Sequence, residues 1–130
     1  MVGMKVKTRD EIGKVIARAK RANIENLGHA GGAIRKAAQH SIRKSPEPSA
    51  SGTPPHTRRG LLRKSILYAV EKARSRVVIG PSVNIVGPAG MPHEFGGPFR
   101  KERYPRRPFM GPALDKVRDR LPWYWEASVR

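Results

Sequence analysis

Residues 93–114 have the sequence HEFGGPFRKERYPRRPFMGPAL, and the rest of the chain is best interpreted outward from this segment. It contains all three phenylalanines of the protein, two carboxylates, a cluster of arginines and seven glycine or proline residues. A loop that only joined two elements would rarely hold so many aromatic side chains. We therefore predict a loop over residues 98–110, and an upstream chain that serves as a scaffold presenting the segment to a partner.

A C-terminal helix is predicted over residues 111–129, because Pro112 suits a first helical turn and an apolar face follows it. Pro122 should kink or restart this helix. The tail Trp123-Tyr124-Trp125 contains both tryptophans of the protein. These aromatic residues are either a lid on the core or an anchor into a partner.

Short antiparallel strands are predicted over residues 61–97. An alternating apolar pattern and the β-branched run Val77–Ile79 indicate a β-hairpin with a turn near Lys72–Ser75. A helical start to the first strand is the alternative. One further short strand is expected around Val83–Val86, before glycine and proline residues interrupt the pattern.

Residues 45–60, SPEPSASGTPPHTRRG, contain four prolines and no apolar periodicity. This composition predicts an extended arm without helix or strand. We expect such an arm to become ordered in an assembly. His56, which lies in the arm, has no second metal ligand at a useful spacing and is interpreted as an ordinary loop histidine.

A long helix is predicted over residues 8–44. Thr8 and Glu11 form a capping-box pattern, and an apolar stripe begins at Ile12. Gly28, Gly31 and Gly32 mark either a kink or a place where another backbone packs closely. The helix would be about 55 Å long, which is long for so small a domain and predicts that part of it packs on a neighbour.

These elements predict a single α+β domain over residues 1–130, with a long N-terminal helix, a small antiparallel sheet, a C-terminal helix and long Pro/Gly-rich arms. The hydrophobic fraction is low, at 38%, and there are 13 glycines and 12 prolines among 130 residues. We therefore expect a modest core completed by contacts with other chains. There is no cysteine, so disulfides and thiolate metal sites are excluded.

The formal net charge of +17 is the strongest compositional signal. It predicts attraction to nucleic acid or to an acidic protein surface, and the basic face of the long helix is either solvated or a contact for such a partner. No apolar run is long enough for a membrane span, so a soluble product made in a cytoplasm is expected.

Patterns of catalytic chemistry are absent from the sequence. His93-Glu94 resembles the start of a zinc-protease helix, but Gly97 stands where the second histidine would be. No nucleophile elbow, phosphate-binding loop or dinucleotide fingerprint is found. We expect neither an enzyme nor a protein with a metal or other cofactor.

Two side chains of the central segment have alternative interpretations. Glu94 either neutralises part of the arginine cluster at the surface or pairs bidentately with an arginine across a subunit boundary. Phe109 either anchors a subunit contact or, with Met110 and Leu114, packs the terminal helix onto the sheet of its own chain. The two roles of Phe109 are compatible.

A series of motifs in order resembles the neck and tail-completion proteins of tailed bacteriophages. The first is T-x-x-G-x-L-R-x-S-I over residues 57–66, after a long helix and a Pro-rich link. V-V-I-G-P (Val77–Pro81) and H-E-F-G-G (His93–Gly97) follow, and R-P-F-M-G-P-A-L (Arg107–Leu114) completes the pattern. The likeness covers roughly residues 10–120. The arm is longer than the usual link and the basic excess is high for this family.

The resemblance implies a non-enzymatic virion protein at the head–tail junction. It implies a homo-oligomeric ring, a hexamer or dodecamer, that adjoins head-connector and tail ring proteins, with contact to packaged DNA as an option. The residues expected at subunit or partner interfaces are Glu94, Phe95, Arg107, Phe109, Met110, Trp123 and Trp125. The residues expected to contact phosphates or an acidic partner are Arg58, Arg59, Arg103 and Arg106.

A basic nucleic-acid-binding protein of ribosomal or nucleoid type is the alternative. Its support is the charge and the segment RKERYPRR, in which an aromatic residue lies among arginines. Under the ring hypothesis, Phe109→Ala should weaken assembly more than Arg58→Ala, because a buried aromatic anchor outweighs an exposed charge.

Overall fold

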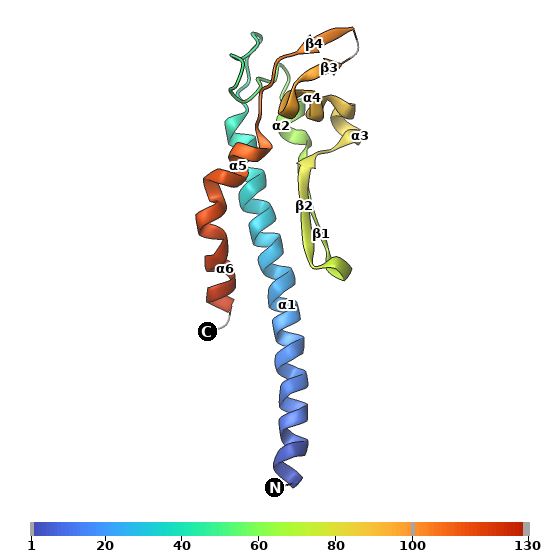
Figure 1. Cartoon of the computed structure of the whole chain (residues 1–130), viewed down its shortest axis with the longest axis vertical. Coiled ribbons are helices and arrows are strands. Elements are labelled where there is room, and N and C mark those ends of the chain that lie inside the picture. The colour runs from blue at the N-terminus through green and yellow to red at the C-terminus, as the bar shows by residue number, and fades with distance from the viewer. Residues whose placement is uncertain (1, 100, 129–130) are drawn as a thin grey trace.

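A computed structural model describes the backbone of residues 2–99 and 101–128, and the side chains of residues 11–99 and 101–126. Figure 1 shows one helix, α1, running the length of the molecule, with a β-hairpin on one side of it and two C-terminal helices on the other. The remaining short elements gather at the end of the molecule opposite the N-terminus. The predicted α+β class is confirmed.

Helix α1 spans Val2–Ser41, which makes it about 60 Å long. The helix begins earlier than the predicted residue 8, so Thr8 lies within it and is not its first residue. The side chain of Thr8 lies outside the described residues. The helix also ends before the predicted residue 44. Two hydrogen bonds from the Arg63 guanidinium to the Ile42 carbonyl hold this end, one of them from Nε at 2.9 Å.

The predicted hairpin is formed by β1 (Ile66–Glu71) and β2 (Arg76–Pro81). The strands are antiparallel, with Ile66 opposite Pro81 and Glu71 opposite Arg76. The turn between them is the 3-10 helix η1 (Lys72–Arg74), as the sequence predicts. The helical start that was the alternative is also present, because α2 (Leu61–Ser65) leads directly into β1.

The hairpin lies along α1, and Gly31 permits the close approach. A Cβ atom at this position would lie 2.8 Å from side-chain atoms of both Tyr68 and Val77. The helix continues without interruption through Gly28 and Gly32. Close packing is therefore found at Gly31, although the neighbouring atoms belong to side chains and not to the predicted backbone, and the kink interpretation is wrong.

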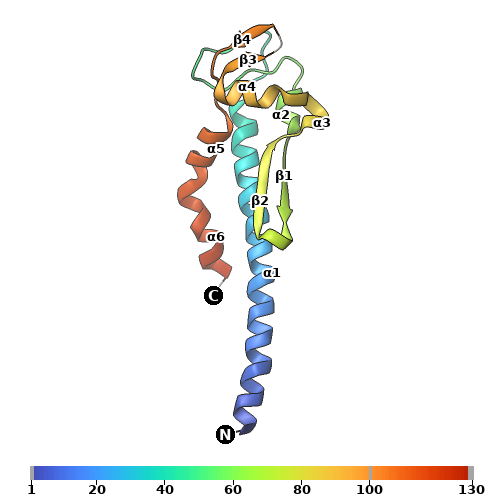
Figure 2. The ribbon, with the colours of Figure 1, turned by 45° about the vertical axis from the view of Figure 1, so that its right-hand side comes forward.

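The end of the molecule farthest from the N-terminus holds the arm, α3 (Val83–Val86), η2 (Gly87–Ala89), α4 (Gly90–Phe95) and a second hairpin, β3 (Gly97–Phe99) with β4 (Glu102–Tyr104). Figure 2 shows these elements stacked above the β1–β2 hairpin. The strand expected at Val83–Val86 is wrong, since a short β-branched run is compatible with either element and here forms one helical turn. The loop expected over 98–110 instead contains most of the second hairpin.

The C-terminal helix starts one residue before the predicted 111, as α5 (Met110–Val117). It passes through η3 (Arg118–Arg120) and restarts as α6 (Leu121–Ser128), with Pro122 in the first turn where its missing N–H costs nothing. The predicted restart is confirmed, and residue 129 lies outside the described residues.

The core is small and joins three regions of the chain. It lies where α5 and the α2–β1 junction meet the C-terminal half of α1, with flanking contacts from Ile79, Val86 and Leu121. The buried residues that form it are Ile34, Ala38, Ile42, Leu62, Ile66, Phe109, Ala113 and Val117.

The arm over residues 45–60 contains no helix or strand, apart from a single parallel bridge between Lys44 and Thr57. It nevertheless packs on its own chain. Ser49, Pro55 and Thr57 are buried, and the Thr57 amide donates to the Arg43 carbonyl at 2.8 Å. The arm therefore has contacts within its own chain, and the expectation that it becomes ordered in an assembly stays a prediction.

Candidate functional site

Glu94 links α4 to the start of α5 within one chain. Its Oε2 accepts hydrogen bonds from the backbone amides of Phe109 and Met110 at 2.8 and 2.9 Å, and its Oε1 accepts one from the Gly111 amide at 2.9 Å. A carboxylate at a helix N-terminus satisfies amides that have no partner inside the helix and interacts favourably with the helix dipole. Neither predicted role for Glu94 includes these amide contacts within its own chain, and its pairing with an arginine of another subunit stays a prediction.

Arg106 and Arg107 fasten the arm to the segment that follows the second hairpin. The Arg106 carbonyl accepts a 2.8 Å hydrogen bond from the Gly52 amide, and Arg107 Nε donates to the Ser49 carbonyl at 2.8 Å. Arg107 also donates its amide to the His93 carbonyl at 2.6 Å. The guanidinium of Arg107, predicted at a subunit interface, thus makes its described side-chain hydrogen bond inside its own chain.

The predicted aromatic anchors divide into buried and exposed groups. Phe109 is 1% exposed and lies in the core, so the interpretation that it packs its own chain is the one the structure supports. Met110 is half-buried against that core. Phe95 is 71% exposed at the end of α4, where it remains accessible to another molecule.

The C-terminal aromatic residues also fall into two groups, those that contact α1 and one that is exposed. Trp125 Nε1 donates to Asn23 Oδ1 at 2.9 Å, and the Tyr124 ring stacks on His29 with centroids 5.8 Å apart. These two residues attach α6 to α1. Trp123, in contrast, is 63% exposed. The lid interpretation therefore fits Tyr124 and Trp125, and Trp123 is left as a candidate anchor.

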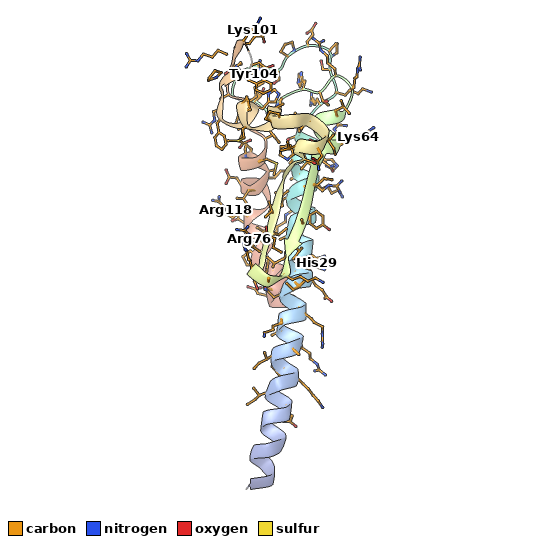
Figure 3. All side chains as sticks on the ribbon, turned by 90° about the vertical axis from the view of Figure 1, so that its right-hand side faces the viewer. His29, Lys64, Arg76, Lys101, Tyr104 and Arg118 are labelled. Carbon is orange, nitrogen blue, oxygen red and sulfur yellow. The ribbon has the colours of Figure 1, made fainter. Side chains whose placement is uncertain are left out.

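All four arginines predicted to contact phosphates or an acidic partner are exposed. Arg58 and Arg59 lie just before α2, Arg103 lies on β4, and Arg106 follows that strand. Figure 3 shows Lys101 and Tyr104, of the same hairpin region, at the end of the molecule opposite the projecting part of α1. This end is therefore basic and accessible.

The N-terminal half of α1 extends beyond the rest of the molecule (Figures 1 and 2). We call residues 11–22 the projecting segment; every residue from 11 to 21 is exposed. Its apolar side chains include Ile12, Val15 and Ile16. The apolar stripe can be recognised in the sequence. The sequence does not show that this part of the stripe lies beyond the elements that pack on the rest of α1. The available signal was the predicted helix length, which exceeds what a small domain can cover.

Two further apolar surfaces were missed at the sequence level. Leu67 and Val78 lie on the face of the β1–β2 hairpin that alternates with the residues packed on α1, and both are exposed. Met91 and Phe95, four residues apart on α4, share a helix face and are also exposed. In the β1–β2 hairpin, the pairing of the two strands determines which apolar side chains lie together on the outer face. The alternation within each strand does not reveal this pairing.

His93 is the titratable group whose environment is most altered in the basic end. Burial, and then the positive charge of Arg107, lower its pKa from the ordinary value of 6.5. Its ring lies 5.7 Å from that of Tyr104. Since both effects disfavour the imidazolium, His93 is neutral at physiological pH.

Within residues 2–99 and 101–128, no group of three or more potential ligands is arranged to hold a metal ion. Nor do the described helices include one with the length and apolar character needed to cross a bilayer. Comparison of the chain with protein-family models, curated proteins and solved structures finds no match.

Proposed function

We propose that this chain is a structural subunit of a homo-oligomeric ring at the head–tail junction of a tailed bacteriophage, where it joins the head connector to the tail. The family resemblance supplies the location. The general assembly role is supported by the surfaces that the isolated chain leaves uncovered. In this proposal the protein has no catalytic activity and acts through its contacts.

The projecting segment is the observation that carries the proposal. Ile12 and Ile16 continue the helical stripe that is buried farther along at Ala30 and Ile34, but they are 51% and 49% exposed. Covering a half-exposed isoleucine would contribute roughly 1 kcal/mol. A helix with an apolar stripe and no covering element is typical of a subunit whose neighbour completes the packing.

The exposed residues elsewhere suit the same role. In a ring built by head-to-tail contacts, each subunit uses two different surfaces. The projecting segment is one candidate. The other candidates are the outer face of the β1–β2 hairpin and the exposed aromatic side chains Phe95 and Trp123.

A basic nucleic-acid-binding protein is the second candidate function. The observation in its favour is the exposed arginine cluster at the far end of the molecule, which includes Arg58 and Arg103. This cluster could equally face packaged DNA or an acidic neighbouring ring in the first proposal.

Size-exclusion chromatography with light scattering separates the two functions. The purified chain is run with and without nuclease treatment, at about 0.1 M and 1 M salt. A ring held by apolar contacts keeps a multiple of the 14.5 kDa subunit mass after nuclease treatment and at high salt. A nucleic-acid complex dissociates to a monomer as salt rises, and that result would reject the ring.

A matched pair of variants locates the contact. Ile16→Glu places a carboxylate on the exposed apolar stripe, while Ala17→Glu makes the same charge change on an exposed position about 100° around the helix. We expect Ile16→Glu to lower the assembled fraction at least tenfold and Ala17→Glu to leave it nearly unchanged. Equal masses for the two variants would remove the projecting segment from the interface.

A further inference from the structure

The basic end contains an open cavity of about 420 Å³ between the arm and the β4 segment. Three parts of the chain line it: the arm, the end of α4 at His93, and residues 102–107. The cavity is unrelated to the apolar surfaces considered for assembly. It is large enough for a small organic ligand.

Two buried polar atoms in this lining have no hydrogen-bond partner among the described residues: Ser49 Oγ and His93 Nδ1. Ser49 is 7% exposed and lines the cavity, and its hydroxyl oxygen is closed off from solvent, so the side chain must rotate about χ1 before the hydroxyl can donate to a ligand in the cavity. An unpaired buried polar group costs free energy that a ligand with a complementary atom would recover. A neutral histidine can present an N–H at Nδ1, and a hydroxyl can rotate to donate.

Arg107 completes this group of donors. Its Nε is fixed by the Ser49 carbonyl at 2.8 Å, which holds the half-buried guanidinium beside the Ser49 and His93 side chains. Arg58 and Arg103 add positive charge from the arm side and from β4. Glu47 and Glu102 also line the cavity and are exposed like Arg58 and Arg103, so solvent screens these four charges alike, and the half-buried Arg107 remains as the least screened charge of the lining.

The chemistry of this wall favours a phosphate group over a carboxylate. Five donor side chains, including three guanidinium groups, converge from three segments, and a phosphate offers more acceptor oxygens and more charge than a carboxylate does. The cavity is also larger than a phosphate ion. Its remaining wall contains Tyr104 and several proline rings, which suit a sugar or a base.

We propose that this cavity binds a nucleotide, with its phosphate on Ser49, His93 and Arg107 and its sugar or base against Tyr104 and the prolines. The nucleotide is either a free one or a unit of a nucleic-acid strand. The proposal does not depend on ring assembly. Light scattering tests the ring, and ligand titration tests this site.

The first experiment is calorimetric titration of the full chain with 5′-AMP, with adenosine and with inorganic phosphate, at about 0.3 M salt to suppress non-specific attraction. We expect 5′-AMP to bind, phosphate to bind more weakly and to compete with it, and adenosine to bind at least tenfold more weakly than 5′-AMP. Equal affinities for adenosine and 5′-AMP would overturn the proposal. So would a glutamate-rich peptide that binds the cavity while 5′-AMP does not.

Ser49→Ala is the decisive variant, because it removes a hydroxyl with no described partner and leaves the backbone carbonyl that holds Arg107. It should fold normally and bind 5′-AMP about tenfold more weakly, the effect of losing one hydrogen bond to a charged group. Arg120→Ala is the matched control. It removes a cation from a second basic cavity of about 440 Å³ between α1 and the C-terminal helices. Unchanged binding in Ser49→Ala, or an equal loss in Arg120→Ala, would contradict the assignment.

NMR titration of His93 gives an independent measurement. The negative charge of a bound phosphate opposes the effect of the Arg107 charge and favours the imidazolium, so the pKa of His93 should rise when 5′-AMP is added. A pKa of His93 that 5′-AMP leaves unchanged would overturn the assignment. The other charged or titratable groups that line the cavity are Glu47, His56, Arg58, Glu102, Arg103, Tyr104 and Arg107.

A single-stranded oligonucleotide distinguishes the two sources of the nucleotide. Displacement of 5′-AMP by a ten-residue oligothymidylate, reduced in Ser49→Ala, assigns the site to a nucleic-acid strand. Binding of 5′-AMP that the oligonucleotide does not displace assigns it to the free nucleotide. Both results support the phosphate site, while displacement that is identical in Ser49→Ala contradicts it.

Discussion

Residues 23–41 and residues 11–22 belong to one helix and carry one apolar stripe, yet their surroundings differ. In the first stretch the stripe is covered by the β1–β2 hairpin on one side and by α5 and α6 on the other (Figure 2). In the second stretch no described part of the chain covers it. The comparison shows that an amphipathic pattern states what a helix needs to bury, and that the rest of the chain determines how much is buried in the monomer.

The largest expected difference comes from the same substitution made in each stretch. Ile34→Ala removes a side chain that is 6% exposed in the core, and should lower the free energy of unfolding by about 3 kcal/mol. Ile16→Ala removes a half-exposed side chain and should change the stability of the monomer by less than about 0.5 kcal/mol. Urea unfolding of both variants under dissociating conditions measures the difference. Similar losses would mean that the projecting segment is packed in the monomer.

Removal of the Glu94 carboxylate should have the next largest effect on the packed region. Glu94→Ala leaves the amides of Phe109, Met110 and Gly111 without their acceptor, and we expect a loss of about 2 kcal/mol. Glu102→Ala is the control, because this carboxylate is exposed on β4. Thermal unfolding compares them, and an equally mild effect of both would argue against the capping role.

Glycine-to-alanine substitutions test the same difference between the packed and the projecting stretch of α1. Gly31→Ala introduces a methyl group against Tyr68 and Val77 and should destabilise the chain by about 1–2 kcal/mol. Gly13→Ala meets nothing within 4 Å and should stabilise the helix by about 0.5–1 kcal/mol. Circular dichroism during thermal unfolding reports both. Stabilisation by Gly31→Ala would show that the hairpin is not held closely against the helix.

The smallest expected effect is a pH dependence that arises from His93. Its folded pKa lies below 6.5, so the unfolded chain binds the proton more readily. The contribution of His93 to stability is complete above about pH 6.5 and is lost as the pH falls through the lower folded value. His93→Gln should therefore flatten the acid side of the stability profile. A profile that keeps its slope in the variant would assign the dependence to other groups.

Local patterns in the sequence predict part of this architecture. The long helix, the β1–β2 hairpin with its turn, and the restart at Pro122 depend on periodicity and on residues that are neighbours in the chain. The sequence does not single out Gly31 as the point of close packing, because Gly28 in the same helix meets nothing within 4 Å. The helical turn at Val83–Val86 is not predictable either, since three apolar residues among four do not distinguish a strand from a helical turn.

The roles of individual side chains depend on contacts that are distant in sequence. Glu94 caps amides that lie 15 to 17 residues downstream, and Arg107 contacts a carbonyl 58 residues upstream. The chemical types of these two residues mark them in the sequence, but the sequence does not reveal these partners within their own chain. Ser49 is missed entirely, because a serine in a Pro-rich arm gives no sign that its hydroxyl will be buried.

The continuity of α1 has a mechanical consequence. A helix without a hinge behaves as a stiff lever whose pivot is the core around Ile34 and Ile42. Residue 11, at the end of the projecting segment, lies about 40 Å from the middle of that pivot, so a tilt of about 5° displaces it by roughly 3.5 Å. Any load applied to the free end is therefore transmitted as torque to the region where the hairpin and the C-terminal helices meet.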